Sequence, residues 1–329
     1  MKRVSLFILG LVITFIGLQA QQKVTGGFPI NITEAPWQVL LSLNNSYGCG
    51  GSIIAPNYIL TAKHCVVGLS ASNVKVIAGV TCKNEINSSN TFNVSQIILH
   101  PDPNVDAALL QLSSNITFNN NRQLVNFWSS ADNALYNVGN ETRVSGWGWT
   151  IPNNSGSTPN CLEAVNLNII SNQDASNVLR PTWGRDLYAY EVAVTGTGNI
   201  RQGACHGDSG GPLTTLTSSN IPVLIGIVEG GIPGCTGNNQ NSPSVFTRVS
   251  HIRNWIINTI NCTAVNFTGT VTTPIIVTTP SIVTSCGDIN VQYVKVQNGA
   301  KLTLDAAGEV NIISDFEVDL GSEFEIIYP

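Results

Sequence analysis

Charged residues are scarce in this sequence. Asp, Glu, Lys and Arg account for 11% of its 329 residues, against about 25% in an average soluble domain, so its surface polarity must come largely from Asn, Ser and Thr. No block of Lys and Arg occurs, and the formal net charge is -5. Because binding to nucleic acid needs a concentrated positive surface, we expect no nucleic-acid partner.

Long apolar runs are also absent, except at the N-terminus. Residues 1–20 read MKRVSLFILGLVITFIGLQA, in which Lys2 and Arg3 precede an apolar stretch of roughly 15 residues, the pattern of a signal peptide. A membrane anchor is the alternative, but a span needs about 20 apolar residues, and the polar QQK follows at once. We therefore expect a secreted protein, extracellular or at the cell surface, without a membrane span in the mature chain.

Residues 24–262 consist of short β-rich runs, such as PWQVLLSL and DAALLQL, broken by Gly, Asn, Pro and Ser. This spacing predicts an antiparallel sandwich or barrel. Clear helical spacing occurs only in residues 249–260, VSHIRNWIINTI, and predicts a C-terminal helix. The apolar stripe of that helix consists of Ile252, Trp255, Ile256 and Ile260.

The last part of the chain has a different composition. Residues 263–285 are rich in Thr, Pro and Val and lack charge, which favours an extended linker. In residues 286–329 apolar and polar residues alternate, and the corners NGA, AAG and LGS recur about every ten residues. This predicts a small coiled or stacked β module. It contains no His and no nucleophile in a recognisable setting, so we assign it no chemistry.

The run HGDSGGP places Ser209 between an aspartate and two glycines. Acyl transfer by a serine needs a general base, a group that orients the base, and donors for the oxyanion. His64, in LTAKHC, stands directly before a cysteine that can fix its backbone. Asp106, in NVDAALLQL, opens an apolar strand, where a carboxylate is costly unless it has a partner.

Four motifs, TAKHC, DAALLQL, GWGW and GDSGGP, occur in an order that places His before Asp before Ser. Through them residues 24 to about 260 resemble the trypsin/chymotrypsin family of serine peptidases. The resemblance implies an all-β fold of two six-stranded antiparallel barrels with a C-terminal helix. It also implies that Ser209 attacks, His64 is the base, Asp106 orients His64, and the N–H groups of Gly207 and Ser209 form the oxyanion hole.

The same resemblance implies activation by cleavage. In KVTGG, cutting after Lys23 would release Val24, whose new amino group would pair with Asp208. Residues 21–23 would then be a short propeptide, and 24–262 the peptidase domain.

The resemblance implies that Gly203 forms the floor of the specificity pocket and that Gly231 and Ser244 form its walls. An arginine or lysine substrate side chain would meet no counter-charge at this floor. We therefore expect an uncharged or apolar P1 residue, as in chymotrypsin- or elastase-like enzymes. Such an enzyme would not readily cut after Lys23, so a separate activating peptidase is expected.

The eight cysteines of an exported chain predict four disulfides. Two pairs match the family, one beside His64 and one beside the pocket. The other two follow from loops that are neighbours in this fold and from the cysteines that remain, the last pair tethering the tail module. The expected pairs are Cys49–Cys65, Cys205–Cys235, Cys82–Cys161 and Cys262–Cys286.

Several residues depart from the family pattern. Lys63 replaces a small residue, Glu229 replaces a serine that hydrogen-bonds the catalytic aspartate, and Gly230 replaces a pocket-wall tryptophan. Our hypothesis is that Lys63 and Glu229 form an ion pair; two unrelated exposed side chains are the alternative. A calcium loop needs several carboxylates, and the corresponding TCKNEINSSNT offers only Glu85. We expect no metal and no other cofactor.

The sequence as a whole indicates a secreted serine endopeptidase that acts on proteins or peptides through an acyl-enzyme intermediate. A catalytically silent homologue that binds or adheres is the alternative, and the departures at Lys63 and Glu229 are its support. A lipase or esterase does not fit the chain order or the lack of alternating helices. Residues 286–329 also resemble the short C-terminal β modules of secreted Bacteroidetes-type proteins, which implies secretion or surface attachment.

Overall fold

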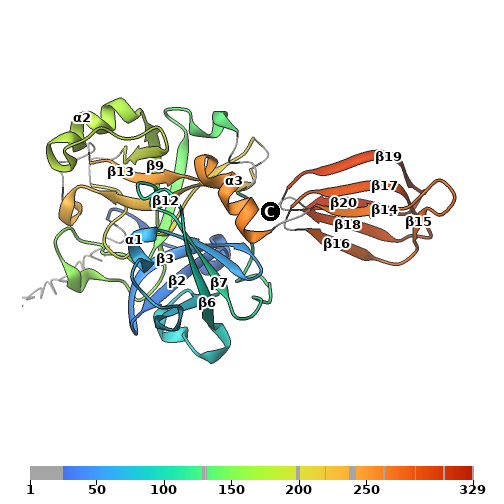
Figure 1. Cartoon of the computed structure of the whole chain (residues 1–329), viewed down its shortest axis with the longest axis horizontal. Helices are drawn as coiled ribbons and strands as arrows, with labels where there is room; N and C mark the ends of the chain where they lie inside the picture. Colours follow the sequence, from blue (N-terminus) through green and yellow to red (C-terminus); the bar gives the residue numbers. More distant parts are fainter. Residues whose placement is uncertain are drawn as a thin grey trace, which may run out of the picture.

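The computed structural model describes residues 25–127, 130, 132–197, 201–218, 220–236, 242–261, 264–285, 287–306 and 308–327. The expected signal peptide and propeptide lie outside these residues. Figure 1 shows two packed β-barrels and, beyond the helix α3 (Val249–Ile260), a smaller elongated β unit. Within the described part of the chain, none of the helices combines the length and the apolar character that crossing a bilayer requires.

The first barrel is closed and antiparallel, in the strand order β2-β3-β4-β7-β6-β5. A two-residue turn joins β2 to β3, and both its residues, Asn44 and Asn45, have positive φ, as such hairpins require. Inward-facing side chains such as Val39, Ile53 and Ile59 are fully buried. The strands are β2 (Gln38–Leu43), β3 (Ser46–Ala55), β4 (Tyr58–Thr61), β5 (Val74–Ala78), β6 (Thr91–Leu99) and β7 (Ala108–Leu112).

The second barrel is closed by the pairing of β8 with β9. Together the barrels confirm the predicted pair of six-stranded antiparallel barrels, and α3 is the predicted terminal helix, with Ile252 and Ile256 buried. The short β1 (Phe28–Pro29) adds to β9 outside the ring. The strands are β8 (Glu141–Gly146), β9 (Glu163–Ile170), β10 (Glu191–Thr195), β11 (Pro212–Leu216), β12 (Pro222–Gly231) and β13 (Ser244–Arg248).

A second long helix, α2 (Asn172–Trp183), was not expected from the sequence. Its apolar periodicity is weak, because it buries only Ala175, Ser176 and Leu179. The local signals lie at its ends. The Ser171 side chain accepts a hydrogen bond from the Asp174 N–H, and Gly184 ends the helix in the left-handed conformation.

The C-terminal unit is a stack of parallel strands, unlike the antiparallel barrels. Ile289 of β17 (Ile289–Val296) pairs with Val310 of β19 (Val310–Val318), 21 positions later. The strands that alternate with these two along the chain form a second parallel sheet, which consists of β16 (Ser281–Ser285), β18 (Lys301–Ala306) and β20 (Glu323–Ile327). The chain therefore coils through both sheets in turn, as a β-solenoid with two strands per coil. This agrees with the predicted coiled β module.

The expected linker, residues 263–285, differs from the structure. It contains β14 (Val265–Thr268), β15 (Ile275–Val277) and β16, which pair with β17 or β18. The abundant Thr and Val suit strands, while Pro274 and Pro280 stand just before β15 and β16. The solenoid therefore begins near residue 265 rather than at 286.

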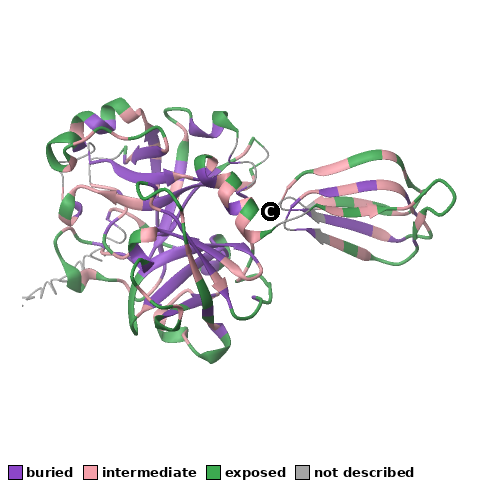
Figure 2. Ribbon diagram, in the orientation of Figure 1, coloured by how far each residue is buried: buried purple, intermediate pink, exposed green. Residues whose placement is uncertain are grey.

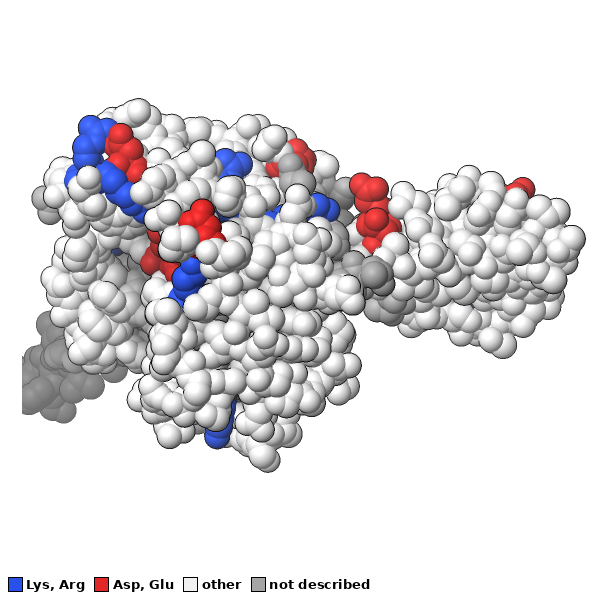
Figure 3. Space-filling view, viewed as in Figure 1, with Lys and Arg blue, Asp and Glu red and all other residues white. Residues whose placement is uncertain are grey.

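The charged side chains are few and dispersed over the face seen in Figure 3, in line with the composition. Burial is continuous through the two barrels and narrower along the solenoid, as Figure 2 shows. The solenoid core, which includes Val291, Val294, Leu302 and Leu304, is a cluster of its own.

This separate core leads to a stability prediction. Leu304→Ala removes a fully buried side chain from β18, and such a change costs about 2 to 5 kcal/mol. We expect calorimetry of the whole chain to show a lower unfolding temperature for the solenoid and an unchanged transition for the barrels. Ile282→Ala, at a side chain that is 70% exposed, is the control. Equal shifts of both transitions in Leu304→Ala would contradict independent cores.

Candidate active site

His64 and Asp106 meet because their flanking strands pair. His64 lies in the short helix α1 (Lys63–Val66), just after β4, and Asp106 just precedes β7, which pairs with β4. The His64 Nδ1 atom is 2.6 Å from Asp106 Oδ2, and the His64 backbone N–H donates to Oδ1 at 2.8 Å. The carboxylate therefore fixes both ring and backbone. With the proton held at Nδ1, a neutral His64 presents Nε2 as an acceptor.

Ser209 lines the same cleft as His64, in a cavity of about 670 Å³ at the seam between the barrels. Strands of both barrels hold its turn: Gly50 N of β3 donates to Ser209 O at 2.8 Å, and Gly210 N donates to Val228 O of β12 at 2.9 Å. The Sγ atom of Cys65 contacts both His64 Nε2, at 3.8 Å, and Ser209 O, at 3.6 Å. Three residues predicted from separate motifs are thus gathered at one seam.

The glycines on either side of Ser209 are required by close packing. Gly210 has φ +78°, and a Cβ there would lie 2.7 Å from Gly50 O. Gly207 has φ +100°, and a Cβ there would lie 3.0 Å from Gly148 Cα. A larger residue would be strained at both positions, so the GDSGG spacing is the spacing that this turn can accommodate.

Asp208 is completely buried and, unlike Gly207 and Ser209, does not line the described cleft. Its carboxylate accepts hydrogen bonds from Gly148 N at 2.8 Å and Cys205 N at 2.9 Å. A Cβ at Gly148 would come 2.5 Å from Asp208 Oδ2, which explains a glycine of the GWGW motif. Burial raises the pKa of Asp208 to about 6, although the backbone hydrogen bonds from Cys205 and Gly148 and the charge of Lys83 lower it. Among the described residues no cation forms an ion pair with Asp208.

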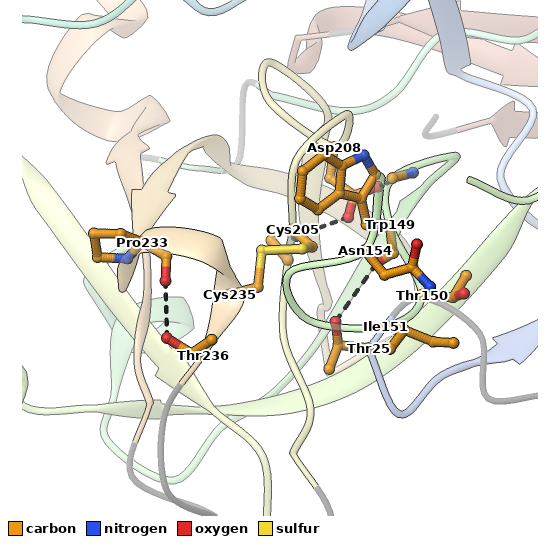
Figure 4. The surroundings of a disulfide bond; sticks show 12 residues. Thr25, Trp149, Thr150, Ile151, Asn154, Cys205, Asp208, Pro233, Cys235 and Thr236 are labelled. Carbon is orange, nitrogen blue, oxygen red and sulfur yellow. Dashed lines mark hydrogen bonds between the residues drawn. A yellow bond between two sulfur atoms is a disulfide. The ribbon is translucent and has the colours of Figure 1, made fainter. Parts of the chain in front are cut away.

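The start of the described chain lies close to Asp208. Thr25 is buried, its Oγ1 donates to Trp149 O at 3.5 Å, and its carbonyl accepts from Gly203 N at 3.2 Å. Figure 4 shows Thr25, Trp149 and Asp208 around the Cys205–Cys235 disulfide. Val24 itself lies outside the described residues.

Three disulfides, Cys49–Cys65, Cys82–Cys161 and Cys205–Cys235, are present and match the expected pairs. The fourth expected pair, Cys262–Cys286, lies outside the described residues. Among the described residues, one group of side chains is close enough together to hold a metal, namely Cys49, His64 and Cys65. Because both sulfurs are already joined to each other, that group offers no thiolate ligand.

The hypothetical ion pair between Lys63 and Glu229 is wrong, because each side chain has another partner. Lys63 Nζ donates to the carbonyl of Asp102 at 2.6 Å. The Glu229 Oε1 atom lies 3.7 Å from Arg185, and its Oε2 accepts a hydrogen bond from Thr247 Oγ1 at 3.1 Å. The cation beside Glu229 thus comes from the loop after α2, which the sequence pattern did not connect to this site.

Glu229 is nevertheless linked to Asp106 through a shared neighbour, Thr247. The same Thr247 hydroxyl lies 3.3 Å from the backbone carbonyl of Asp106. Arg185 binds Glu191 more closely, at 2.9 and 2.5 Å, than it binds Glu229. Burial, together with the nearby carboxylates of Glu191 and Asp106, therefore raises the pKa of Glu229 to about 8.

The three residues of the expected specificity pocket are not equivalent in the structure. Gly231 lines the cleft, whereas Gly203 and Ser244 are absent from the described lining residues. Instead Ser244 Oγ accepts from Ala204 N at 3.1 Å, and a Cβ on Gly203 would lie 2.8 Å from that oxygen. Ser244 therefore contacts the backbone of Ala204, which does line the cleft, and Gly203 leaves room for this contact.

Two residues near the pocket were missed in the sequence. Trp183, at the end of α2, donates from Nε1 to Gly231 O at 3.1 Å and packs nearest to Gly230. An indole thus covers Gly230, where the sequence lacks the family tryptophan. Arg201 is the second, because its side chain lines the cleft. Neither had a periodic or motif signal that could have identified it.

The raised pKa of Glu229 gives a testable pH dependence. In the folded state Glu229 keeps its proton up to about pH 8, against an ordinary pKa of 4.5. Its contribution to stability is therefore complete below about pH 4.5 and is lost as the pH rises through about 8. Glu229→Gln removes this titration. We therefore expect the unfolding temperature of the variant, relative to that of the wild type, to increase as the pH rises from about 5 to about 9.

The control for this experiment is Glu141→Gln, at an exposed position on β8. Thermal unfolding followed by circular dichroism across the pH series measures both variants. A difference between Glu229→Gln and wild type that stays constant with pH would contradict the raised pKa.

Comparisons with known proteins agree with this geometry. The family model described as Trypsin matches residues 24–256. Trypsin alpha of Drosophila melanogaster is 34% identical over 250 residues, covering 74% of this chain and 90% of the relative. Trypsin delta of the same species is 33% identical over 247 residues, covering 73% and 89%. The solenoid lies beyond the matched region. The chain thus belongs to the trypsin family of serine endopeptidases.

Proposed function

We propose that this protein is a secreted endopeptidase in which His64, Asp106 and Ser209 form the catalytic triad. Ser209 Oγ attacks the scissile carbonyl while His64 Nε2 takes its proton and then donates it to the leaving amine. Asp106 stabilises the imidazolium that forms. A water molecule, activated by the same histidine, releases the acyl group. The observation that carries this proposal is the 2.6 Å contact between His64 and Asp106 in the cleft that Ser209 lines.

The oxyanion hole of this proposal consists of the backbone N–H groups of Gly207 and Ser209. Gly207 has a φ of +100°, which orients its peptide in a way that few other residues tolerate. A backbone donor at this point stabilises the tetrahedral intermediate, and one such donor is worth about 10²- to 10³-fold in turnover.

Activation would follow cleavage after Lys23 by a separate peptidase. The new amino group of Val24 would then supply the cation that the buried Asp208 carboxylate lacks among the described residues. The position of Thr25, one residue further along, against Trp149 and Gly203 supports this route. A buried carboxylate with a paired amine holds the Gly207–Ser209 turn in place.

The P1 side chain of the substrate would be uncharged or apolar. The residues that line the cleft after Glu229 include Gly230, Gly231, Ile232 and Pro233, which offer no charge. Glu229 is the one acidic residue among the described lining residues, and it already contacts Arg185 and Thr247. Although the relatives carry the name trypsin, a lysine or arginine side chain would find no free carboxylate here.

The solenoid would serve secretion or attachment to the cell surface, since its strands present no nucleophile in a catalytic setting. The competing proposal is a catalytically silent homologue that binds or adheres, and labelling of Ser209 distinguishes the two. All three triad residues are present, and two of them are in contact.

A fluorophosphonate probe tests the catalytic proposal. We expect the chain that begins at Val24 to be labelled at Ser209, and Ser209→Ala to lose labelling and about 10⁶-fold in peptide hydrolysis. Ser113→Ala, at an exposed serine, should match the wild type in both readouts. A correctly folded chain starting at Val24 that is neither labelled nor active would instead support the silent homologue.

Processing is tested separately. Full-length protein treated with a lysine-specific peptidase should gain activity as Val24 becomes the N-terminal residue, measured by intact mass and by probe labelling. Lys23→Gln should block both changes, whereas Lys75→Gln, on the exposed side of β5, should not. Full labelling of uncleaved Lys23→Gln would contradict activation at this bond.

A further inference from the structure

Arg201 is a cation on the wall of the cleft that forms no ion pair with any of the described residues. It lies eight positions before Ser209 on the segment that also carries Ala204, Cys205 and Gly207, all of which line the same cavity. Its Nε and Nη1 atoms are shielded from solvent and form no hydrogen bond with the described part of the chain. A guanidinium normally uses its N–H donors in a fixed planar fork, so this arrangement leaves donors unused.

An anion next to such a guanidinium would stabilise it. Removing a charged group from water costs several kcal/mol unless a counter-charge and hydrogen bonds replace the water. Burial lowers the pKa of Arg201 to about 10, so the side chain keeps its charge at neutral pH. Both the positive charge of Arg201 and two of its N–H donors therefore lack a partner among the described residues.

The described protein residues do not supply this anion. Glu229 is the one acidic residue that lines the described cleft, and its carboxylate lies against Arg185 and Thr247. The other basic residue of the lining, Lys83, donates from Nζ to the carbonyl of Pro159 at 2.9 Å. Cations thus exceed free anions in the cleft, and the missing partner can enter with the substrate.

We infer that Arg201 binds a carboxylate on the substrate, so that a P1 glutamate is cleaved faster than its neutral isostere glutamine. The inference rests on the proposed peptidase function and deepens its specificity. The walls that would receive the P1 side chain are the Arg201–Gly207 segment and the end of β12 with the segment after it, which the Cys205–Cys235 disulfide joins to the first wall. A carboxylate there can accept paired, charge-assisted hydrogen bonds from the guanidinium.

The same cation bears on the other substrates. A P1 lysine or arginine would bring a second positive charge next to Arg201, which adds repulsion to the missing counter-charge. Apolar side chains can still use the uncharged wall of Gly231 and Ile232. Arg201 therefore adds glutamate to the accepted residues and strengthens the rejection of basic ones.

The experiment compares peptides that differ only at P1, with Glu, Gln, Phe or Arg. The chain beginning at Val24 is first titrated with the fluorophosphonate probe, so that kcat/KM refers to active sites. We expect Glu to exceed Gln by about 10- to 100-fold, the range that charged hydrogen bonds supply. Arg201→Gln should abolish this ratio and leave Phe cleavage intact, and Arg201→Lys should retain part of it.

Arg180→Gln is the matched control, because Arg180 pairs with Asp186 on the exposed surface of α2. It should keep the wild-type ratio of Glu to Gln. Labelled wild-type enzyme that cleaves both peptides equally, or Arg201→Gln that keeps the preference, would overturn the role of Arg201 alone. Absence of labelling in the wild type would overturn the peptidase function, and this inference with it.

Discussion

The burial of carboxyl groups at the seam between the two barrels is the constraint on which the rest of this structure depends. Asp106, Asp208 and Glu229 all lie at or near this seam, and a carboxylate removed from water needs partners. Each carboxylate meets this need in a different way. Asp106 binds the ring and backbone of His64, Asp208 accepts two backbone N–H groups, and Glu229 has a hydroxyl and a more distant guanidinium.

These different solutions suit different tasks. The tight contact of Asp106 with His64 fixes one tautomer, which a general base requires. Asp208 is completely buried, and its burial raises its pKa to about 6 despite two backbone hydrogen bonds. Glu229 is linked to Asp106 through the Thr247 hydroxyl, which donates to Glu229 Oε2 and lies 3.3 Å from the Asp106 carbonyl, and its raised pKa keeps it protonated at neutral pH. The seam thus contains one close pair, His64 and Asp106, and two carboxyl groups, Asp208 and Glu229, whose pKa values are raised by burial.

The solenoid follows a separate physical logic. Its strands bury a narrow row of apolar side chains between two parallel sheets, while the barrels close on themselves and bury wide interiors. Alternation of apolar and polar residues indicates a strand with one buried face in either case. It does not indicate which strand lies alongside, and so the Thr-rich segment before residue 286 could be taken for a linker although it contributes three strands.

Four ordered motifs in the sequence were enough to predict the fold and to name His64, Asp106 and Ser209 as candidates, because the local backbone of these motifs allows few alternatives. The glycines around Ser209 and Asp208 lie in such motifs. The family resemblance that they carry also predicted the three disulfides that the structure contains. Only the tertiary structure decided that Glu229 lies beside Arg185 rather than Lys63, that Trp183 covers Gly230, and that Arg201 lines the cleft. These contacts join residues far apart in the chain, and a charge or a ring in a sequence carries no information about which distant surface folds against it.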